Sequence, residues 1–156
     1  MSLKSEAASF LSQKRIAVVG VSRSGGTGSG ILTALRKRGY TTIPVNPQAT
    51  EIDGEPCFHT LQEIPGGVDA AVVVTRPEAV DAVVDDCIAA GVGHVWMHEN
   101  AFFGAGASSV SDAAATKGRA AGLNVIAGGC PLMFGEGADF GHRCMRWLLE
   151  RTGKLP

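Results

Sequence analysis

The chain has 156 residues, of which 45% are hydrophobic and 19% charged, a composition that suits one globular domain with a sizeable core over residues 1–156. A formal net charge of −1 excludes the basic surface that attracts nucleic acids or anionic membranes. No apolar stretch is long enough to cross a membrane, and the N-terminus lacks the apolar core of a signal peptide. The four cysteines include no CxxC pair, so we expect reduced thiols and a cytoplasmic location.

Five short apolar runs predict strands, because continuous rather than alternating apolar sequence is typical of parallel strands covered on both faces. These runs are residues 16–20, 41–45, 70–74, 92–97 and 123–127. Apolar residues at helical spacing predict helices in the N-terminal segment 1–13, at 29–38, 78–90 and 108–121, and in the C-terminal segment 136–151. The less regular interval 51–64 predicts a turn, a short strand and one helical turn capped by Thr60.

Strands and helices therefore alternate along the chain. This alternation predicts an α/β fold, a single Rossmann-like, doubly wound domain with a mainly parallel sheet of about five strands and helices on both faces. Right-handed crossovers place the carboxyl ends of the strands at one edge of the sheet, where such folds bind ligands. We therefore expect the functional residues directly after each strand.

The segment after the first strand is the most informative. Arg15–Gly30 reads RIAVVGVSRSGGTGSG, a strand that leads through a glycine-rich turn into a helix. The backbone N–H groups of such a turn, together with the helix dipole, favour a bound phosphate. Ser22 stands where the dinucleotide fingerprint has its middle glycine. The candidate binding residues are Gly20, Val21, Ser22, Arg23, Gly26, Thr27 and Gly28, and the alternative is a flexible surface turn.

The next strand ends supply further candidates. Asn46 and Pro47 follow the second strand, where an NAD site usually has an acid for the ribose hydroxyls. Their presence disfavours NAD, and Pro47 offers an apolar edge for an adenine ring. Thr75, Arg76 and Pro77 follow the third strand, and Arg76 is a fixed cation suited to phosphate. A plain turn at Asn46 and a merely exposed Arg76 are the alternatives.

Four stretches in this order resemble the small CoA-binding proteins, whose domain also forms the N-terminus of succinyl-CoA synthetase α subunits and ADP-forming acyl-CoA synthetases. They read IAVVGVSRSGGTGSG, RGYTTIPVNPQATEIDGEPCFHTLQEIP, VDAAVVVTRPEAV and AAGVGHVWMHENA, and lie within residues 14–131. The chain departs from the family pattern in three places, one of which is residues 128–151, where only the Cys-Pro turn is retained. Arg23 comes early in the first loop with Thr27 near the usual basic position, and WMHENAFFG replaces a WLQxG-like sequence.

The resemblance implies coenzyme A (CoA), free or acylated, as the ligand, with its phosphates at Gly20, Ser22 and the glycine-rich turn. It further implies that Asn46 and Pro47 border the adenosine end. Thr75, Arg76 and Pro77 would flank the adenine or the pantetheine arm. We add His98 as a candidate, because it follows a strand at the same edge of the predicted sheet. A CoA ligase needs a further domain with a phosphorylated histidine, which this sequence does not contain. We therefore expect a carrier, sensor or accessory module without its own catalysis, with its oligomeric state and protein partners left open.

Besides a purely structural role as a subunit partner, two other functions stay open from the sequence. One is an NAD(P)-dependent oxidoreductase, which Ser22 and Asn46 disfavour. The other is an enzyme of acyl-CoA thiol chemistry in which His98 activates Cys130, although a cysteine after a strand is more often a small buried residue. Cys130, His98, His142 and Cys144 lack the short ligand spacing of a zinc motif, so no metal site is predicted.

Overall fold

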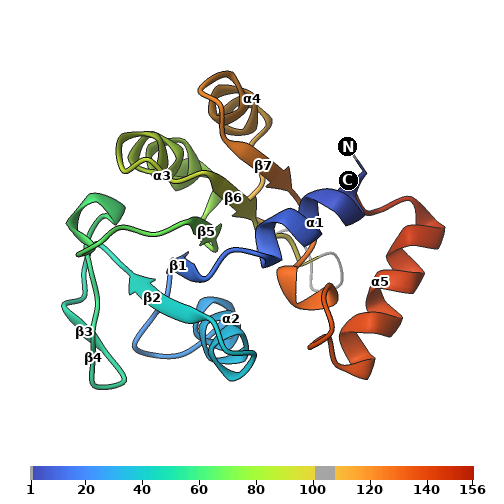
Figure 1. Cartoon of the computed structure of the whole chain (residues 1–156), viewed down its shortest axis with the longest axis horizontal. Coiled ribbons are helices and arrows are strands. Elements are labelled where there is room, and N and C mark those ends of the chain that lie inside the picture. Colours follow the sequence, from blue (N-terminus) through green and yellow to red (C-terminus); the bar gives the residue numbers. More distant parts are fainter. Residues whose placement is uncertain (1, 101–107) are drawn as a thin grey trace.

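A sheet of five parallel strands forms the centre of the computed structural model, which describes residues 2–100 and 108–156 (Figure 1). In spatial order the strands are β2 (Thr41–Val45), β1 (Arg15–Val19), β5 (Ala70–Val73), β6 (His94–Met97) and β7 (Asn124–Ala127). The direction of the strand order reverses between β1 and β5, as in doubly wound sheets. The predicted α/β fold with its parallel sheet is confirmed.

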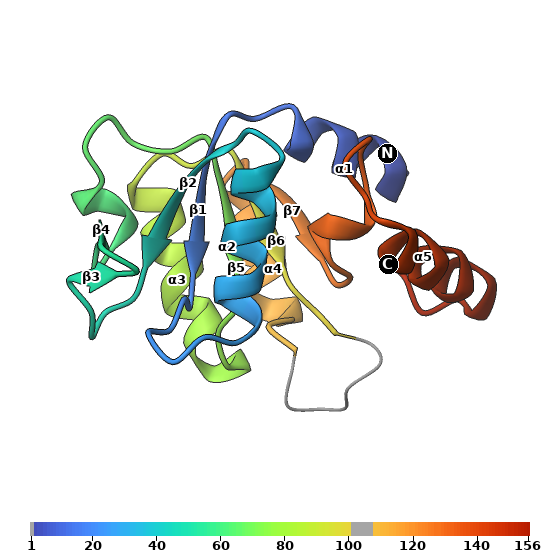
Figure 2. The ribbon, with the colours of Figure 1, turned by 90° about the horizontal axis from the view of Figure 1, so that it is seen from below.

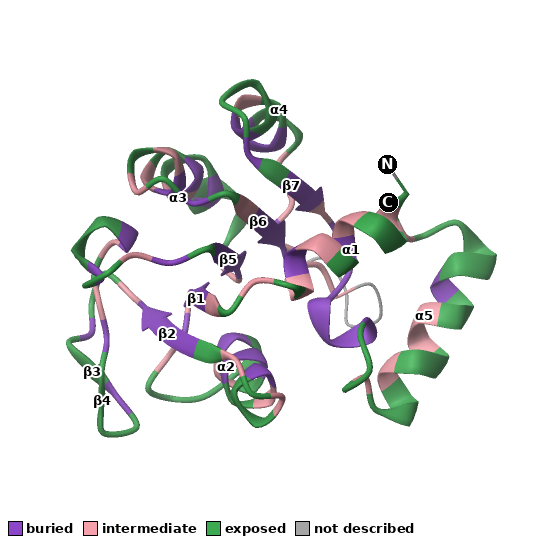
Figure 3. Ribbon diagram, in the orientation of Figure 1, coloured by how far each residue is buried: buried purple, intermediate pink, exposed green. Residues whose placement is uncertain are grey.

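Helices cover both faces of the sheet (Figure 2). They are α1 (Leu3–Leu11) and α2 (Thr27–Lys37) on one face, and α3 (Pro77–Ala89) and α4 (Asp112–Ala120) on the other. Alternate residues of β1 point to opposite sides, since Ile16 and Val18 join the core under α1 and α2, whereas Ala17 and Val19 join the core under α3 and α4. The central strands are buried on both faces, as their continuous apolar sequence predicts (Figure 3).

Shorter elements complete the fold. They are the antiparallel pair β3 (Glu51–Ile52) and β4 (Glu55–Pro56), and the 3-10 helices η1 (Leu61–Glu63) and η3 (Pro131–Met133). The last helix, α5 (Phe140–Thr152), lies to one side of the layered part, beyond η3 (Figures 1 and 2). In the part of the chain that the structure describes, no helix is both long and apolar enough to span a membrane.

The starts of two predicted helices are wrong, in both instances because a side chain caps the helix later than expected. The helix predicted at 108–121 begins at Asp112, where the hydroxyl of Ser111 accepts a backbone N–H. The helix predicted from residue 136 begins at Phe140, where Asp139 accepts a backbone N–H in the same way. Glu136 consequently lies outside α5.

Two smaller expectations also need correction. The helical turn predicted after Thr60 is η1, but the Thr60 hydroxyl makes no capping bond there. The N-terminal helix ends at Leu11 rather than at residue 13, with Ser12 as its C-cap, and Met1 lies outside the described residues.

Candidate functional site

The carboxyl ends of the strands lie side by side in the sheet. Val19 is paired with Val45 on one side and with Val73 on the other, and Val73 is paired in turn with Met97. The loops that follow these residues therefore meet at one edge. The reversal of strand order between β1 and β5 leaves a crevice at this edge, which is where open α/β sheets bind ligands.

Gly20 turns the chain sharply at the end of β1. Its φ is +100°, and a Cβ atom there would lie 2.1 Å from the Val74 carbonyl oxygen. Gly28, in the first turn of α2, packs nearly as closely, because its Cβ would lie 2.7 Å from the Gly20 carbonyl oxygen. These two glycines allow the start of α2 to sit against the ends of β1 and β5.

Gly25 and Gly26 form the exposed part of the same loop. Their φ values are +85° and +109°, and no atom of the described residues lies within 4 Å of the positions where Cβ atoms would stand. Gly26 is the N-cap of α2, so no side chain caps this helix. Within the described part of the chain, the N–H groups of its first turn have no side-chain partner and, with the helix dipole, favour an anion.

Ser22 serves the shape of the loop. Its hydroxyl oxygen lies 2.8 Å from that of Ser24 and accepts the Ser24 N–H at 3.2 Å, while its carbonyl accepts the Ser29 hydroxyl at 2.9 Å. The residue that replaces the middle glycine of the dinucleotide fingerprint thus ties the loop to the first turn of α2.

A cavity of about 240 Å³ lies between this loop and the ends of β5 and β6. Its walls are Gly20, Gly25, Thr27, Gly28, Val74, Thr75, Arg76, His98 and Ser109. Two buried polar atoms in it, Thr75 Oγ1 and His98 Nδ1, have no hydrogen-bond partner among the described residues. Because buried polar atoms are normally paired, these two are available to a ligand.

His98 is only 3% exposed at the end of β6. Burial disfavours the charged imidazolium and lowers the pKa of His98 to about 4, so the ring is neutral at pH 7. A neutral imidazole donates one hydrogen bond and accepts another, which suits contact with polar groups of a ligand.

Arg76 and Ser109 lie at the rim and wall of the same cavity. Arg76 is exposed at the N-cap of α3, and it forms no ion pair within the described ranges. The Ser109 hydroxyl donates to the Thr75 carbonyl oxygen at 2.6 Å and holds this strand end in place. Ser109 was not predicted, because it lies far from the glycine-rich motif in sequence and no pattern marks it.

A second cavity of about 620 Å³ adjoins the first, since Gly20 and Thr75 line both. It lies between the end of β2, η1 and α3, and Val45, Pro47 and Val83 give it apolar walls. His59, Thr60 and Gln62 of the η1 region also line it and were not predicted, because only the folded chain brings them to this edge.

Asn46 positions the first loop through its side chain. Its Nδ2 donates to the Val21 carbonyl oxygen at 2.7 Å, and its Oδ1 accepts the Gln48 N–H at 2.8 Å. The amide therefore ties the turn after β2 to the turn after β1 and has its main partners within the protein.

The acids of the second cavity are engaged within the protein. Asp85 Oδ1 lies 2.7 Å from Lys117 Nζ, and Asp86 Oδ2 accepts the Leu61 N–H at 2.7 Å. Among the residues that the structure describes, no acid stands at the end of β2, where a nicotinamide dinucleotide site would need one.

The structure divides the predicted binding residues into three groups. The small cavity collects Gly20, Thr27, Gly28, Thr75, Arg76 and His98, and the larger cavity adds Asn46 and Pro47. The remaining predicted residues, Val21, Ser22, Arg23, Gly26 and Pro77, line neither cavity. Val21 is buried, whereas Arg23, Gly26 and Pro77 are exposed beside the site.

Cys130 is buried in the core on the α1 and α2 side, in the same cluster as Trp96. Burial raises the pKa of the Cys130 thiol to about 11, so little thiolate exists at pH 7 and the thiol is a poor nucleophile. Within the described ranges, no group of three or more His, Cys, Asp or Glu side chains is arranged to hold a metal ion.

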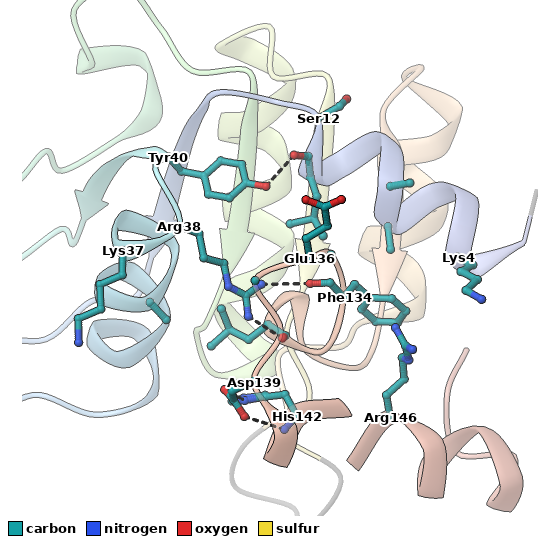
Figure 4. A pocket seen from close by; sticks show the side chains of 17 residues that line it. Lys4, Ser12, Lys37, Arg38, Tyr40, Phe134, Glu136, Asp139, His142 and Arg146 are labelled. Carbon is teal, nitrogen blue, oxygen red and sulfur yellow. Dashed lines mark hydrogen bonds and ion pairs between the residues drawn. The ribbon is translucent and has the colours of Figure 1, made fainter. Parts of the chain in front are cut away.

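A larger cleft of about 1060 Å³ lies between α1, α2 and the segment 132–146 (Figure 4). Arg38 crosses it and donates to the carbonyl oxygens of Leu132 at 2.8 Å and Phe134 at 3.1 Å, and burial lowers the pKa of its guanidinium. The Tyr40 hydroxyl donates to the Leu11 carbonyl oxygen at 2.7 Å. None of the predicted binding residues lines this cleft.

Comparison with protein families gives a match to the model described as CoA binding domain over residues 14–136. The chain belongs to this CoA-binding domain family. The matched range includes the glycine-rich loop, the lining residues of both adjoining cavities and every predicted binding residue.

Curated relatives of this CoA-binding domain include both large ligases and a small protein. The ADP-forming acetate–CoA ligase I of Archaeoglobus fulgidus is 37% identical over 75 residues, which make up 47% of this chain and 11% of the ligase. The uncharacterized protein YneT of Bacillus subtilis is 34% identical over 87 residues, or 55% of this chain and 64% of YneT. The chain thus spans less than two thirds of the length of these relatives.

The solved structures similar to this chain likewise include a small protein and part of a larger synthetase. A hypothetical protein from Pyrococcus horikoshii has a TM-score of 0.73 and 25% identity, with 83% of this chain and 87% of that protein covered. The dinucleotide-forming acetyl-coenzyme A synthetase 1 of Ca. Korarchaeum cryptofilum has a TM-score of 0.61 and 31% identity, with 72% of this chain and 25% of the synthetase covered.

Proposed function

We propose that this CoA-binding domain binds coenzyme A or an acyl-CoA at the carboxyl edge of its sheet, as a carrier, sensor or accessory module without its own catalysis. The observation that carries the proposal is the pair of adjoining cavities that share Gly20 and Thr75. One lies beside an uncapped helix N-terminus and the cation of Arg76, and the other has apolar walls that include Pro47. CoA carries phosphates next to a flat adenine and therefore matches this arrangement.

In this arrangement the phosphates meet the loop at Gly25 and Gly26 and the guanidinium of Arg76, and the adenine lies against Pro47. The small cavity, which Thr75 and His98 line, then receives a neighbouring polar part of the ligand. Family membership supports the same ligand, and the absence of an acid at the described end of β2 argues against NAD. The raised pKa of Cys130 argues against thiol chemistry.

Isothermal titration calorimetry with CoA, acetyl-CoA, NAD⁺ and NADH tests the proposal directly. CoA or acetyl-CoA is expected to bind in the titration. In a separate thermal melt it should raise the melting temperature, because a ligand at 100 times its Kd stabilises the native state by about 2.7 kcal/mol. Tighter binding of NAD⁺ or NADH than of CoA would instead support an oxidoreductase. Absence of any CoA response would refute the proposal.

A pair of arginine variants tests where the phosphates bind. Arg76→Ala is expected to weaken CoA binding about tenfold, since one charge-assisted hydrogen bond is worth about 1.5 kcal/mol. Arg143→Ala removes an exposed arginine of α5 that lines neither cavity, and it should leave CoA affinity unchanged. Equal affinities of the two variants would remove Arg76 from the site.

A further inference from the structure

The outer face of α5 is apolar and uncovered. Phe140 is 82% exposed, Trp147 54% and Leu148 43%, and these are the exposed large hydrophobic side chains of the described part of the chain. Cys144, an exposed cysteine, belongs to the same helix. At 3.6 residues per turn, positions 140, 144, 147 and 148 fall within about 100° of the helix circumference and form one stripe.

The opposite face of α5 already has its contacts within the chain. Leu149 is the buried residue of the helix, and Met145 packs against the core under α1 and α2. Arg146 donates to the Met133 carbonyl oxygen at 3.3 Å and lies over the Phe134 ring at 5.4 Å from its centroid. These contacts hold α5 through the face opposite the stripe, so the stripe residues are exposed. The helix itself lies to one side of the layered part of the molecule (Figure 1).

We propose that this stripe is the interface between two copies of the chain, formed by α5 packing antiparallel on α5 of a second copy about a two-fold axis. The charges at the ends of the helix favour that arrangement. The segment before the helix carries the acids Glu136 and Asp139, the latter also in contact with His142 at 2.6 Å, and the end of the helix and the residues after it carry the bases Arg151 and Lys154. The neighbouring acid Glu150 is paired within the helix with Arg146 at 3.5 Å. An antiparallel pair brings the acids of one copy to the bases of the other, whereas a parallel pair opposes like charges.

The spacing along the helix gives the same pairing. Arg151 lies on the same face of α5 as the stripe, because eleven residues at 3.6 per turn return close to the direction of Phe140. The centre of the segment from Phe140 to Arg151 falls midway between Cys144 and Trp147. A two-fold axis at this centre places Trp147 opposite Cys144 of the second copy and Phe140 opposite Arg151 of the second copy. Arg151, whose guanidinium already lies over Trp147 at 4.4 Å from the ring centroid, then contributes to an aromatic and cationic cluster.

The dimer does not depend on the proposed CoA site, because neither adjoining cavity includes a residue of α5. A standard protein interface buries at least about 1,200 Å², and a single pair of helices of this length buries less. We therefore expect a dissociation constant of the dimer in the micromolar range.

Sedimentation equilibrium over a range of about 1 to 300 µM tests the pairing, because a micromolar dimer changes its population across that range. The full chain should pass from its monomer mass of 16.1 kDa to twice that mass. Trp147→Glu should weaken association at least tenfold, since it puts a charge in the centre of the stripe. Ala113→Glu, a matched change at an exposed position of α4, should associate like the wild type.

Circular dichroism and the melting temperature of each variant check that the fold is retained, as expected for exposed positions. A short bismaleimide should join two chains through Cys144 at concentrations where the dimer forms, and Cys144→Ser should abolish this product. A protein that stays monomeric over the whole range, or a dimer that Trp147→Glu leaves intact, would overturn the proposal.

Discussion

The buried imidazole of His98 should make the stability of this protein fall steeply below neutral pH. The pKa of His98 is lowered to about 4 in the folded state, against 6.5 for an exposed histidine. The unfolded chain therefore binds a proton in the interval between these values while the folded chain does not. Stability that is present above pH 6.5 is accordingly lost as the pH falls toward 4.

The magnitude follows from the two pKa values. Between pH 7 and pH 5, the unfolded state gains about 2 kcal/mol from protonation of this one group relative to the folded state. His98→Gln keeps a neutral polar side chain of similar size but removes the titration. The variant should thus lose about 2 kcal/mol less free energy of unfolding than the wild type over this interval.

Urea denaturation of both proteins at pH 7 and pH 5 measures this difference. Carboxylates and the other histidines titrate in both proteins, so comparing the two pH-dependent losses isolates His98. If the wild type and His98→Gln lost equal stability between pH 7 and pH 5, the argument that burial keeps this imidazole neutral would be refuted.

Three further predictions concern packing, loop position and thiol reactivity. Gly20→Ala should destabilise the fold by about 3 kcal/mol or more in urea denaturation, because its Cβ would clash with backbone at a positive φ. The control Gly30→Ala, in α2 with open space around its Cβ, should be neutral or stabilising. Equal effects of the two variants would contradict the close packing at Gly20. Asn46→Ala should cost about 1–3 kcal/mol and also weaken CoA binding in calorimetry, because the hydrogen bond to Val21 in the neighbouring loop and the bond from Gln48 within its own turn are both lost. Unchanged stability would show that the amide does not hold the loops together. In dilute native protein Cys144 should react rapidly with a thiol reagent at pH 7.5 while Cys130 reacts only on unfolding, and fast labelling of Cys130 would disprove its protected state.

The fold class, the order of the strands along the chain and the position of the glycine-rich loop could be predicted from the sequence alone. Continuous apolar runs identify strands that are covered on both faces, and Gly20 to Gly28 mark a turn that leads into a helix. These features rest on local physics: side-chain burial, backbone conformation and the chemistry of a helix N-terminus act over a few residues. The family resemblance on the same residues was confirmed by the match over residues 14–136.

The contacts, hydrogen bonds and burial of the candidate residues became known only from the folded chain. Gly20 and Gly28 are required by close backbone packing, and the Asn46 amide bonds to the neighbouring loop and to its own turn. His98 is buried, and its Nδ1 has no hydrogen-bond partner among the described residues. Folding also brings Ser109 to the small cavity from a distant part of the chain. The burial of a side chain, its hydrogen-bond partners and the contact between the two cavities depend on segments far apart in sequence. No local sequence pattern encodes such contacts.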